Sequence, residues 1–194
     1  NPAPFINNKY FTFGSFNNPS KMTDDVPNCW SNILKKVKGS KLIIKCSNKK
    51  KKFDRIEKIF KKNGVLDSVT FYYRIDKLED HLNLYKKIDV ALDTFPYNGV
   101  TTSFEAIWMG VPVLTMAGYN FNSRCGESIN KNLNMEQLIA KDEDDYVDKA
   151  VNLSNNYDGY VNLRKSIFTD AIESPLFNRN KFAENFFRSL KKIV

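Results

Sequence analysis

Two patterns of hydrophobic and polar positions alternate along the chain. Short runs rich in β-branched and aromatic residues are followed by stretches in which apolar residues recur every three or four positions. The short runs are typical of strands, and the three-or-four-residue periodicity is typical of amphipathic helices. Their alternation predicts an α/β fold with a doubly wound, Rossmann-like parallel sheet and right-handed crossovers.

The strands that this pattern predicts are short and mostly apolar. They cover residues 11–16, 41–46, 69–73, 88–93 and 111–115. The run 88–93 is almost continuously apolar, which is typical of a strand buried on both faces of a parallel sheet.

Helices are predicted between the strands and in the carboxyl-terminal part of the chain. They cover residues from about 24 to 37, 53 to 62, 76 to 84 and 101 to 109, and a helical carboxyl-terminal segment has amphipathic stretches near 143–154, 158–172 and 179–192. Gly39, Gly64 and Gly110 are expected to end the helices that they follow. With no internal boundary, the 194 residues are predicted to form a single domain, 1–194.

The composition indicates a domain with a hydrophobic core and without a membrane-spanning segment. Hydrophobic residues make up 42% of the chain, enough for a sizeable core, and the mean hydropathy is −0.47. No stretch approaches the ~20 apolar residues that cross a bilayer, so we expect neither a membrane span nor a signal peptide. The chain begins at Asn1 rather than at Met, so we expect a fragment or a processed form.

Three cysteines and one histidine limit the redox and metal chemistry. Cys29, Cys46 and Cys125 are odd in number and lack close paired spacing, so neither a disulfide framework nor a zinc site is indicated. We therefore expect a reducing compartment and a cytoplasmic location. His81 alone cannot form a His-rich metal site, whereas a carboxylate site for Mg²⁺ stays open.

The net charge of +8 favours a polyanionic partner. Most of the excess lies between Lys35 and Lys62 and includes the lysine block 49–52. This stretch lacks aromatic interleaving, zinc-finger spacing and an RRM-type signature, so a solvated face is the better interpretation and nucleic acid is not expected as a partner. A non-enzymatic polyanion-binding module remains the alternative from another functional class.

Ligands of open α/β sheets bind beyond the carboxyl ends of the strands, so the loops after the strands hold the candidate residues. The run Thr101-Thr102-Ser103 brings hydroxyls and free N–H groups to a helix N-terminus, where phosphate is favoured. Asn98-Gly99 allows a tight turn just before it. The alternative is an ordinary N-cap by Thr101 or Thr102.

Other candidates in these loops have both a binding and a structural interpretation. Glu105, placed in the first helical turn, can accept hydrogen bonds from ribose hydroxyls or complement the helix dipole. Lys21 can neutralise a diphosphate or be solvated, and His81 can contact a base or a phosphate or be structural. Asp93, at the end of an apolar run that also holds Asp89, is expected to orient the following loop. Dinucleotide and P-loop glycine motifs are absent from the sequence.

Four segments in register resemble a known family. The run 93–112, DTFPYNGVTTSFEAIWMGVP, resembles the donor-site segment of the O-linked N-acetylglucosamine transferase and SPINDLY-like family. The runs 13–18 with Lys21, 123–126 and 174–177 resemble other landmarks of that family, in the same order. The resemblance covers nearly the whole chain but only the carboxyl-terminal lobe of the family's GT-B catalytic region; its amino-terminal lobe and tetratricopeptide repeats are not in this sequence.

The resemblance implies an inverting, metal-independent transfer of a sugar from a nucleotide donor to Ser or Thr hydroxyls of proteins, without a cofactor. We expect UDP-N-acetylglucosamine as the donor, with GDP-fucose as the alternative. The partners would be the nucleotide sugar and a protein acceptor bound through the missing lobe or the repeats. The general base would also lie there, so the isolated chain should bind nucleotide but transfer little.

By position in the family, Lys21 would bind the diphosphate as the catalytic residue, with Thr101 and Thr102 capping it. His81 would lie against the base and Glu105 would hold the ribose. The remaining residues of the predicted substrate site are Asn17, Asn18, Asn98, Gly99 and Ser103.

Three positions depart from the animal N-acetylglucosamine enzymes. Val100 stands where those enzymes have a His near the diphosphate, Glu105 replaces an Asp, and Asn18 replaces a phosphate-contacting Gln. These departures leave the donor identity open.

Overall fold

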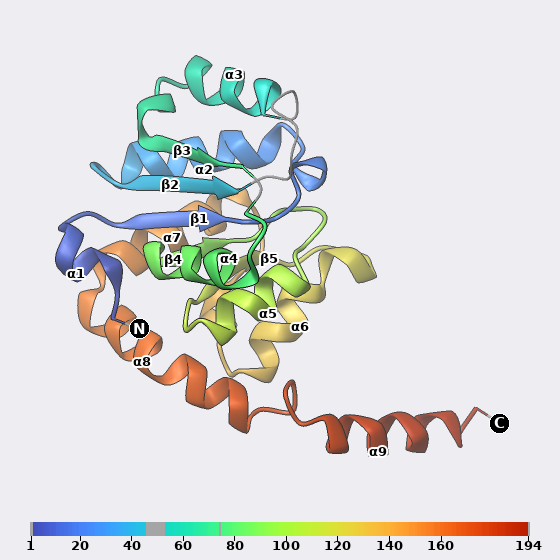
Figure 1. The fold of residues 1–194 in the computed structure, drawn as a ribbon. Coiled ribbons are helices and arrows are strands. Elements are labelled where there is room, and N and C mark those ends of the chain that lie inside the picture. The colour runs from blue at the N-terminus through green and yellow to red at the C-terminus, as the bar shows by residue number, and fades with distance from the viewer. Residues whose placement is uncertain (1, 46–52, 74, 194) are drawn as a thin grey trace.

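The structure, a computed structural model, describes residues 2–45, 53–73 and 75–193 (Figure 1). Within them, six parallel strands form one sheet in the order β3-β2-β1-β4-β5-β6. The strands are β1 (Thr12–Ser15), β2 (Lys41–Lys45), β3 (Val69–Tyr72), β4 (Val90–Leu92), β5 (Val113–Met116) and β6 (Ile139–Ala140). The predicted doubly wound parallel sheet is confirmed.

Helices cover both faces of the sheet. They are α1 (Pro4–Asn8), α2 (Asp25–Lys36), α3 (Asp54–Lys62), α4 (Leu78–Leu84), α5 (Thr101–Trp108), α6 (Cys125–Asn132), α7 (Glu143–Asn155), α8 (Tyr157–Glu173) and α9 (Arg179–Leu190). In Figure 1, α2, α3 and α7 lie on one face, and α4, α5 and α6 lie on the other. The chain therefore forms three layers with the sheet in the middle.

Each face of the sheet carries its own core. Leu42 and Ile44 of β2 point into the first core, where they meet Trp30 of α2, whereas Ile43 points into the second. This split follows from the pleat, because successive strand residues point to opposite faces. At Gly14 of β1, an added Cβ would lie 2.5 Å from a methyl carbon of Ile88, which stands two residues before β4.

The predicted elements match the observed ones closely, with shifts at several ends. Gly39, Gly64 and Gly110 all have positive φ angles and follow helices, as predicted. β4 is shorter than the predicted run 88–93, and β5 begins later than residue 111 because Pro112 has no N–H for the ladder. Cys46, at the end of the predicted second strand, lies outside the described residues. The sequence pattern does not predict α1, α6 or β6.

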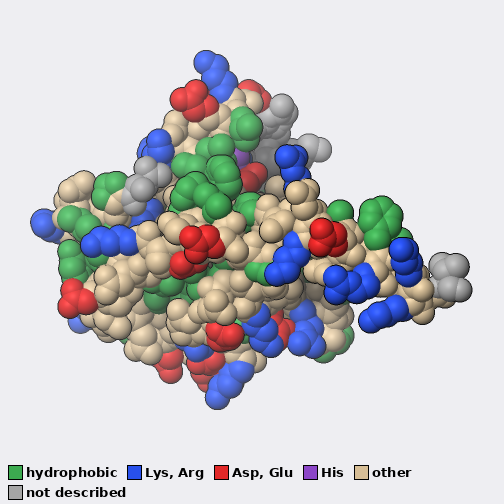
Figure 2. All heavy atoms as spheres, turned by 90° about the horizontal axis from the view of Figure 1, so that it is seen from below, with side chains coloured by type: hydrophobic (Ala, Val, Ile, Leu, Met, Phe, Trp, Pro, Cys, Tyr) green, Lys and Arg blue, Asp and Glu red, His purple; other side chains and the backbone are tan. Residues whose placement is uncertain are grey.

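The carboxyl-terminal helix α9 projects from the body of the domain, and none of its residues is buried (Figures 1 and 2). Its phenylalanines Phe182, Phe186 and Phe187 are at least half exposed. None of the helices in the described ranges has the length and apolar character needed to span a membrane.

Candidate functional site

The candidate residues meet where the strand order reverses. β1 and β4 are neighbours in the sheet, but the chain continues from β1 toward β2 and from β4 toward β5. The loops after β1 and β4 therefore open in a crevice at the carboxyl edge, the usual ligand position in such sheets. Thr102 of α5 donates to Asn17 of the β1 loop over 2.8 Å and so joins the two sides of this crevice.

Asp93, the first residue after β4, holds the loop that leads into α5. Its carboxylate accepts hydrogen bonds from Gly99 N at 2.6 Å, Thr94 N at 2.9 Å and Thr115 Oγ1 at 2.8 Å. Asn17 Nδ2 donates to the same carboxylate over 3.3 Å. Burial raises the pKa of Asp93 to about 6, although the hydrogen bonds and the charge of Lys21 oppose the rise. The prediction that Asp93 orients this loop is confirmed.

Gly99 leaves the space that lets the loop close over Asn17 and Thr102. A Cβ on residue 99 would lie 2.6 Å from Thr102 Oγ1 and 2.8 Å from both Asn17 Oδ1 and Ser103 Oγ. Those distances are shorter than carbon–oxygen contacts allow, so only glycine fits without a shift. Gly99 and Ser103 are buried, and Thr101 is exposed at the start of α5.

The N-terminus of α5 has no side-chain cap. Val100 occupies the N-cap position and has no side-chain oxygen, so the ordinary N-cap by Thr101 or Thr102 is not what the structure contains. The first N–H groups of an α-helix have no acceptor inside the helix. The N–H groups of Thr101, Thr102 and Ser103 therefore have no acceptor inside the helix, and the helix dipole favours an anion there.

Lys21 brings a positive charge to the same turn. Its Nζ donates to the carbonyl oxygen of Asn98 over 2.8 Å and lies 4.3 Å from the centre of the Tyr97 ring. Burial lowers the pKa of Lys21, while the charge of Asp93 acts in the opposite direction. The ammonium is thus held beside the loop that ends at the start of α5.

Two predicted asparagines act within the protein. Asn98 is fully buried, donates to Thr94 O over 3.0 Å and accepts from Gly126 N over 3.2 Å, which ties α6 to the loop after β4. Asn18 is exposed and accepts from Ser20 N over 3.1 Å, so it caps the short turn that carries Lys21. Both side chains therefore help to position the site.

Glu105 lies in the second turn of α5, not in the first as predicted, because residues 101–104 fill the first turn. His81 Nε2 lies 2.9 Å and the Tyr85 hydroxyl 3.0 Å from its Oε2. Burial would raise the pKa of Glu105, but the hydrogen bonds from His81 and from the Tyr85 hydroxyl and the charge of Lys45 together lower it. Glu105 is therefore held as a carboxylate at the mouth of the crevice.

The structure also places residues here that the sequence does not single out. Lys45, the last residue of β2, lies 2.7 Å from His81 Nδ1, and the Tyr85 hydroxyl lies 3.1 Å from Thr102 O. The position of Lys45 at a strand's carboxyl end is a usable signal, but it is obscured by the surrounding lysines. The lysine block 49–52 lies outside the described residues.

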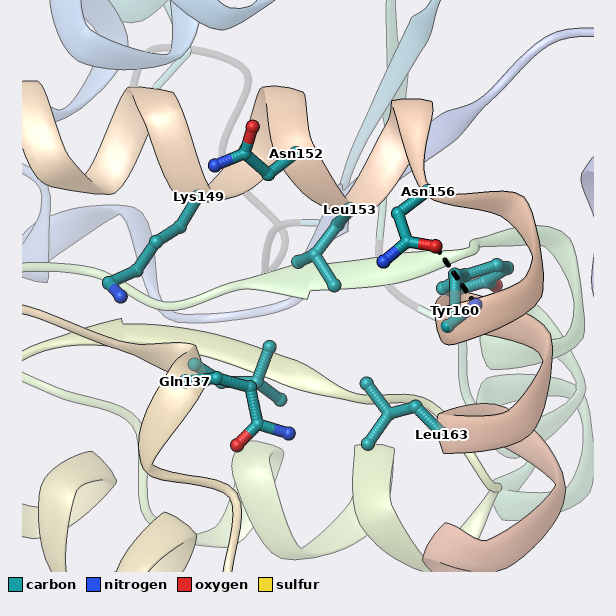
Figure 3. A pocket seen from close by; sticks show the side chains of 9 residues that line it. Gln137, Lys149, Asn152, Leu153, Asn156, Tyr160 and Leu163 are labelled. Carbon is teal, nitrogen blue, oxygen red and sulfur yellow. Dashed lines mark hydrogen bonds between the residues drawn. The ribbon is translucent and has the colours of Figure 1, made fainter.

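A separate hollow of about 410 Å³ lies between α7, α8 and the short turn Glu136–Leu138 (Figure 3). It contains none of the predicted residues, and Leu153 and Leu163 supply much of its wall. Its Asn156 side chain is used to cap α8 by accepting from Gly159 N over 3.0 Å. Lys149 is the charged side chain in its lining, and the helix N-terminus beside it is capped, so the hollow lacks the uncapped N–H groups found at the carboxyl edge.

Metal-binding side chains do not converge on the site. In the described part of the chain, no three His, Cys, Asp or Glu side chains gather closely enough to hold a metal ion. Cys29 is buried and Cys125 is partly exposed, and both are free thiols.

Comparison with known proteins identifies relatives across nearly the whole chain. A SPINDLY protein of Solanum lycopersicum, named a probable UDP-N-acetylglucosamine–peptide N-acetylglucosaminyltransferase, is 38% identical over an alignment 193 residues long. The alignment covers 95% of this chain and 20% of that protein. The related SEC protein of Arabidopsis thaliana is 28% identical over 94% of this chain and 19% of its own length. The chain thus spans about a fifth of the length of the curated relatives it matches.

The fold agrees with these matches. An O-GlcNAc transferase variant of Thermobaculum terrenum superimposes with a TM-score of 0.83 at 26% identity, over 92% of this chain and 36% of that chain. The matched neighbours are GT-B glycosyltransferases, so the fold is that of one GT-B lobe. Residues 6–186 match the pattern of glycosyl transferase family 41. The resemblance inferred from the sequence is confirmed: this chain belongs to glycosyl transferase family 41.

Proposed function

We propose that this chain is the donor-binding lobe of an enzyme that transfers a sugar from a nucleoside diphosphate to Ser or Thr hydroxyls of proteins. The observation that carries the proposal is the uncapped N-terminus of α5 with the Lys21 ammonium held beside the preceding loop. An anion at this turn would meet free N–H donors, the positive end of the helix dipole and a cation.

The diphosphate would lie on the N–H groups of residues 101–103, within reach of the Thr101 and Thr102 hydroxyls. As the bond to the sugar breaks, negative charge grows on the leaving diphosphate, and Lys21 would stabilise it. Preorganised donors of this kind contribute roughly 10²–10³ each in rate. We propose an inverting reaction in which Lys21 supplies positive charge that a metal ion supplies in other transferases.

The other end of the crevice would hold the nucleoside. Glu105 would accept the ribose hydroxyls, and His81 would lie near the base. We propose UDP-N-acetylglucosamine as the donor, in keeping with the names of the SPINDLY relatives. GDP-fucose is the alternative donor that the binding experiment distinguishes. The acceptor protein and the general base would be supplied outside this lobe.

Calorimetric titration of UDP, GDP, UDP-N-acetylglucosamine and GDP-fucose tests the proposal. We expect one nucleoside diphosphate and the corresponding nucleotide sugar to bind. Lys21→Ala should weaken that binding at least tenfold. Lys36→Ala is the matched control, because Lys36 forms an exposed ion pair with Asp148 and should bind as the wild type does. Equal affinity in the Lys21 variant would overturn the role given to Lys21.

The polyanion-binding alternative predicts a different result. A module of that kind would bind nucleic acid with a steep dependence on salt and would ignore changes at Thr101. Titrating the chain with a single-stranded oligonucleotide at two salt concentrations, in the wild type and in Thr101→Ala, separates the two. Nucleotide binding that Thr101→Ala weakens supports the transferase; salt-sensitive oligonucleotide binding alone supports the module.

A further inference from the structure

Four side chains form a continuous chain of contacts along one wall of the crevice. Lys45 Nζ lies 2.7 Å from His81 Nδ1, and His81 Nε2 lies 2.9 Å from Glu105 Oε2. Tyr85 completes the chain, with its hydroxyl 3.0 Å from the same carboxylate oxygen. The residues come from β2, α4, α5 and the turn between α4 and β4, so the contacts join parts of the chain that are far apart in sequence.

The chemistry of the end groups determines the direction of these hydrogen bonds. An ammonium group has only donors and a carboxylate only acceptors. Lys45 must therefore donate to Nδ1, and the ring proton must lie on Nε2, where it is donated to Glu105. The Lys45 ammonium thus selects one tautomer of His81.

The surroundings leave the ring little freedom to turn. The His81 side chain is only 11% exposed, and the ring lies against Phe16 and Tyr85 with centroids 6.3 Å and 5.6 Å away. Lys45 stands at the end of β2, whose backbone pairs with β1 and β3. The donor and the ring are both fixed by the sheet and its packing.

Glu105 is left with one carboxylate oxygen for a ligand. Within residues 2–45, 53–73 and 75–193, the hydrogen bonds to its side chain from His81 and Tyr85 both reach Oε2. The side chain is 24% exposed, so a ligand hydroxyl has access to the carboxylate. A carboxylate held by two donors on one oxygen is oriented for a hydroxyl on the other.

We propose that Lys45 is a positioning residue of the donor site. By fixing the Nε2–H tautomer of His81, it orients Glu105 so that Oε1 receives the ribose hydroxyls of the nucleotide. The last step of this inference, from Glu105 to ribose, rests on the proposed function; the step from Lys45 to His81 does not.

Because His81 is the only histidine of the chain, its tautomer can be read without interference. With ¹⁵N-labelled histidine, long-range ¹H–¹⁵N correlation in the wild type should show the Nε2–H form. Lys45→Met removes the donor and should shift the signal toward a mixture of tautomers, whereas Lys45→Arg keeps a donor and should retain the wild-type form. Lys41→Met, on the same strand and face, is the matched control and should have no effect. An unchanged tautomer in Lys45→Met would overturn the inference.

The consequence for binding is measured with UDP, GDP and their 2′-deoxy forms. We expect Lys45→Met to weaken binding of the preferred nucleotide about tenfold, as for loss of one hydrogen bond to a charged group. The loss should be smaller for the 2′-deoxy form, because the effect acts through Glu105, and Lys45→Arg should restore affinity. Equal loss for both forms would mean direct contact by Lys45 and would overturn the positioning role.

These two measurements separate the inference from the proposed function. If the wild type binds no nucleotide, the proposed function fails, and with it the ribose step. The tautomer measurement on the free chain still decides whether Lys45 controls His81.

Discussion

Two aspartates at opposite ends of β4 have similar burial but different surroundings. Asp89, at the amino end, is 0% exposed and accepts from Thr12 N at 2.8 Å and Phe5 N at 3.1 Å. Asp93, at the carboxyl end, is 1% exposed and accepts from the loop that leads into α5. Burial raises the pKa of each carboxyl above its ordinary value.

The partners of the two carboxylates show what each one does. Asp89 joins α1, β1 and α8, and the charge of the buried Arg164 opposes the rise in its pKa. Asp93 joins loops around an open crevice, and its nearby cation, Lys21, is only partly buried. The same residue type therefore stabilises the packing of α1, β1 and α8 at one end of the strand and holds the loop of the proposed donor site at the other.

The largest effect is expected from Asp89→Asn. This change removes the negative charge that acts on the buried Arg164 guanidinium, whose hydrogen bonds go to the carbonyls of Ile88 and Asp89 and to the Tyr160 hydroxyl. Leaving a buried charge uncompensated costs about 3–5 kcal/mol. Urea unfolding should show this loss of stability, while calorimetry on the folded variant should show unchanged nucleotide affinity. A large loss of affinity without loss of stability would contradict the assignment of Asp89 to the stability of the fold.

Asp93→Asn should give the opposite combination. Its amide cannot accept all the hydrogen bonds of the carboxylate, so we expect a loss of about 1–3 kcal/mol in stability. The loop from residue 94 to 99 should loosen, and nucleotide affinity should fall at least tenfold. Asp148→Asn, at an exposed ion pair, is the control for a charge change of the same kind. Retained affinity in Asp93→Asn would contradict the role of this loop.

The raised pKa of Asp93 predicts that the stability of the wild type depends on pH in a way that the stability of Asp93→Asn does not. A folded-state pKa of about 6, above the ordinary value of 3.8, means that this group's stabilising contribution is full below pH 3.8 and is lost as the pH rises through 6. When the pH falls from 7 to 5, the free energy of unfolding of the wild type should therefore rise by about 1 kcal/mol relative to that of Asp93→Asn. Urea titrations of both proteins at the two pH values measure the difference. A constant difference would show that Asp93 does not titrate in this range.

The smallest effect is expected from a charge pair outside both regions. Lys36 and Asp148 are 55% and 64% exposed and lie 3.0 Å apart. Exposed pairs of this kind contribute about 0.2–1 kcal/mol, so Lys36→Ala should change the free energy of unfolding by no more than this. A loss comparable to that of Asp89→Asn would show that exposed charges matter as much as buried ones here.

The sequence predicts the sheet because periodicity reports burial, and burial is what the strands share. It predicts the loop after β4 for the same reason, since Asp93 ends an apolar run. It does not predict α6, whose residues Cys125–Asn132 carry few apolar positions, or β6, which is two residues long.

The parts of the site that escape prediction depend on contacts between distant residues. Lys45 is one lysine among many until β2 brings it to His81, and Tyr85 is a core residue until its hydroxyl reaches Glu105. The missing cap of α5 also becomes evident only when Val100 is seen at the N-cap position. These contacts and the N-cap position of Val100 cannot be inferred from the spacing of residues along the chain.

A crystal structure of the chain grown with UDP or GDP tests the central claim most directly. The account predicts the diphosphate at the N-terminus of α5, within hydrogen-bond distance of Lys21 and of the N–H groups of residues 101–103, with the ribose at Glu105. Nucleotide in the hollow between α7 and α8, or on the exposed lysines of α2 and α3, would contradict it.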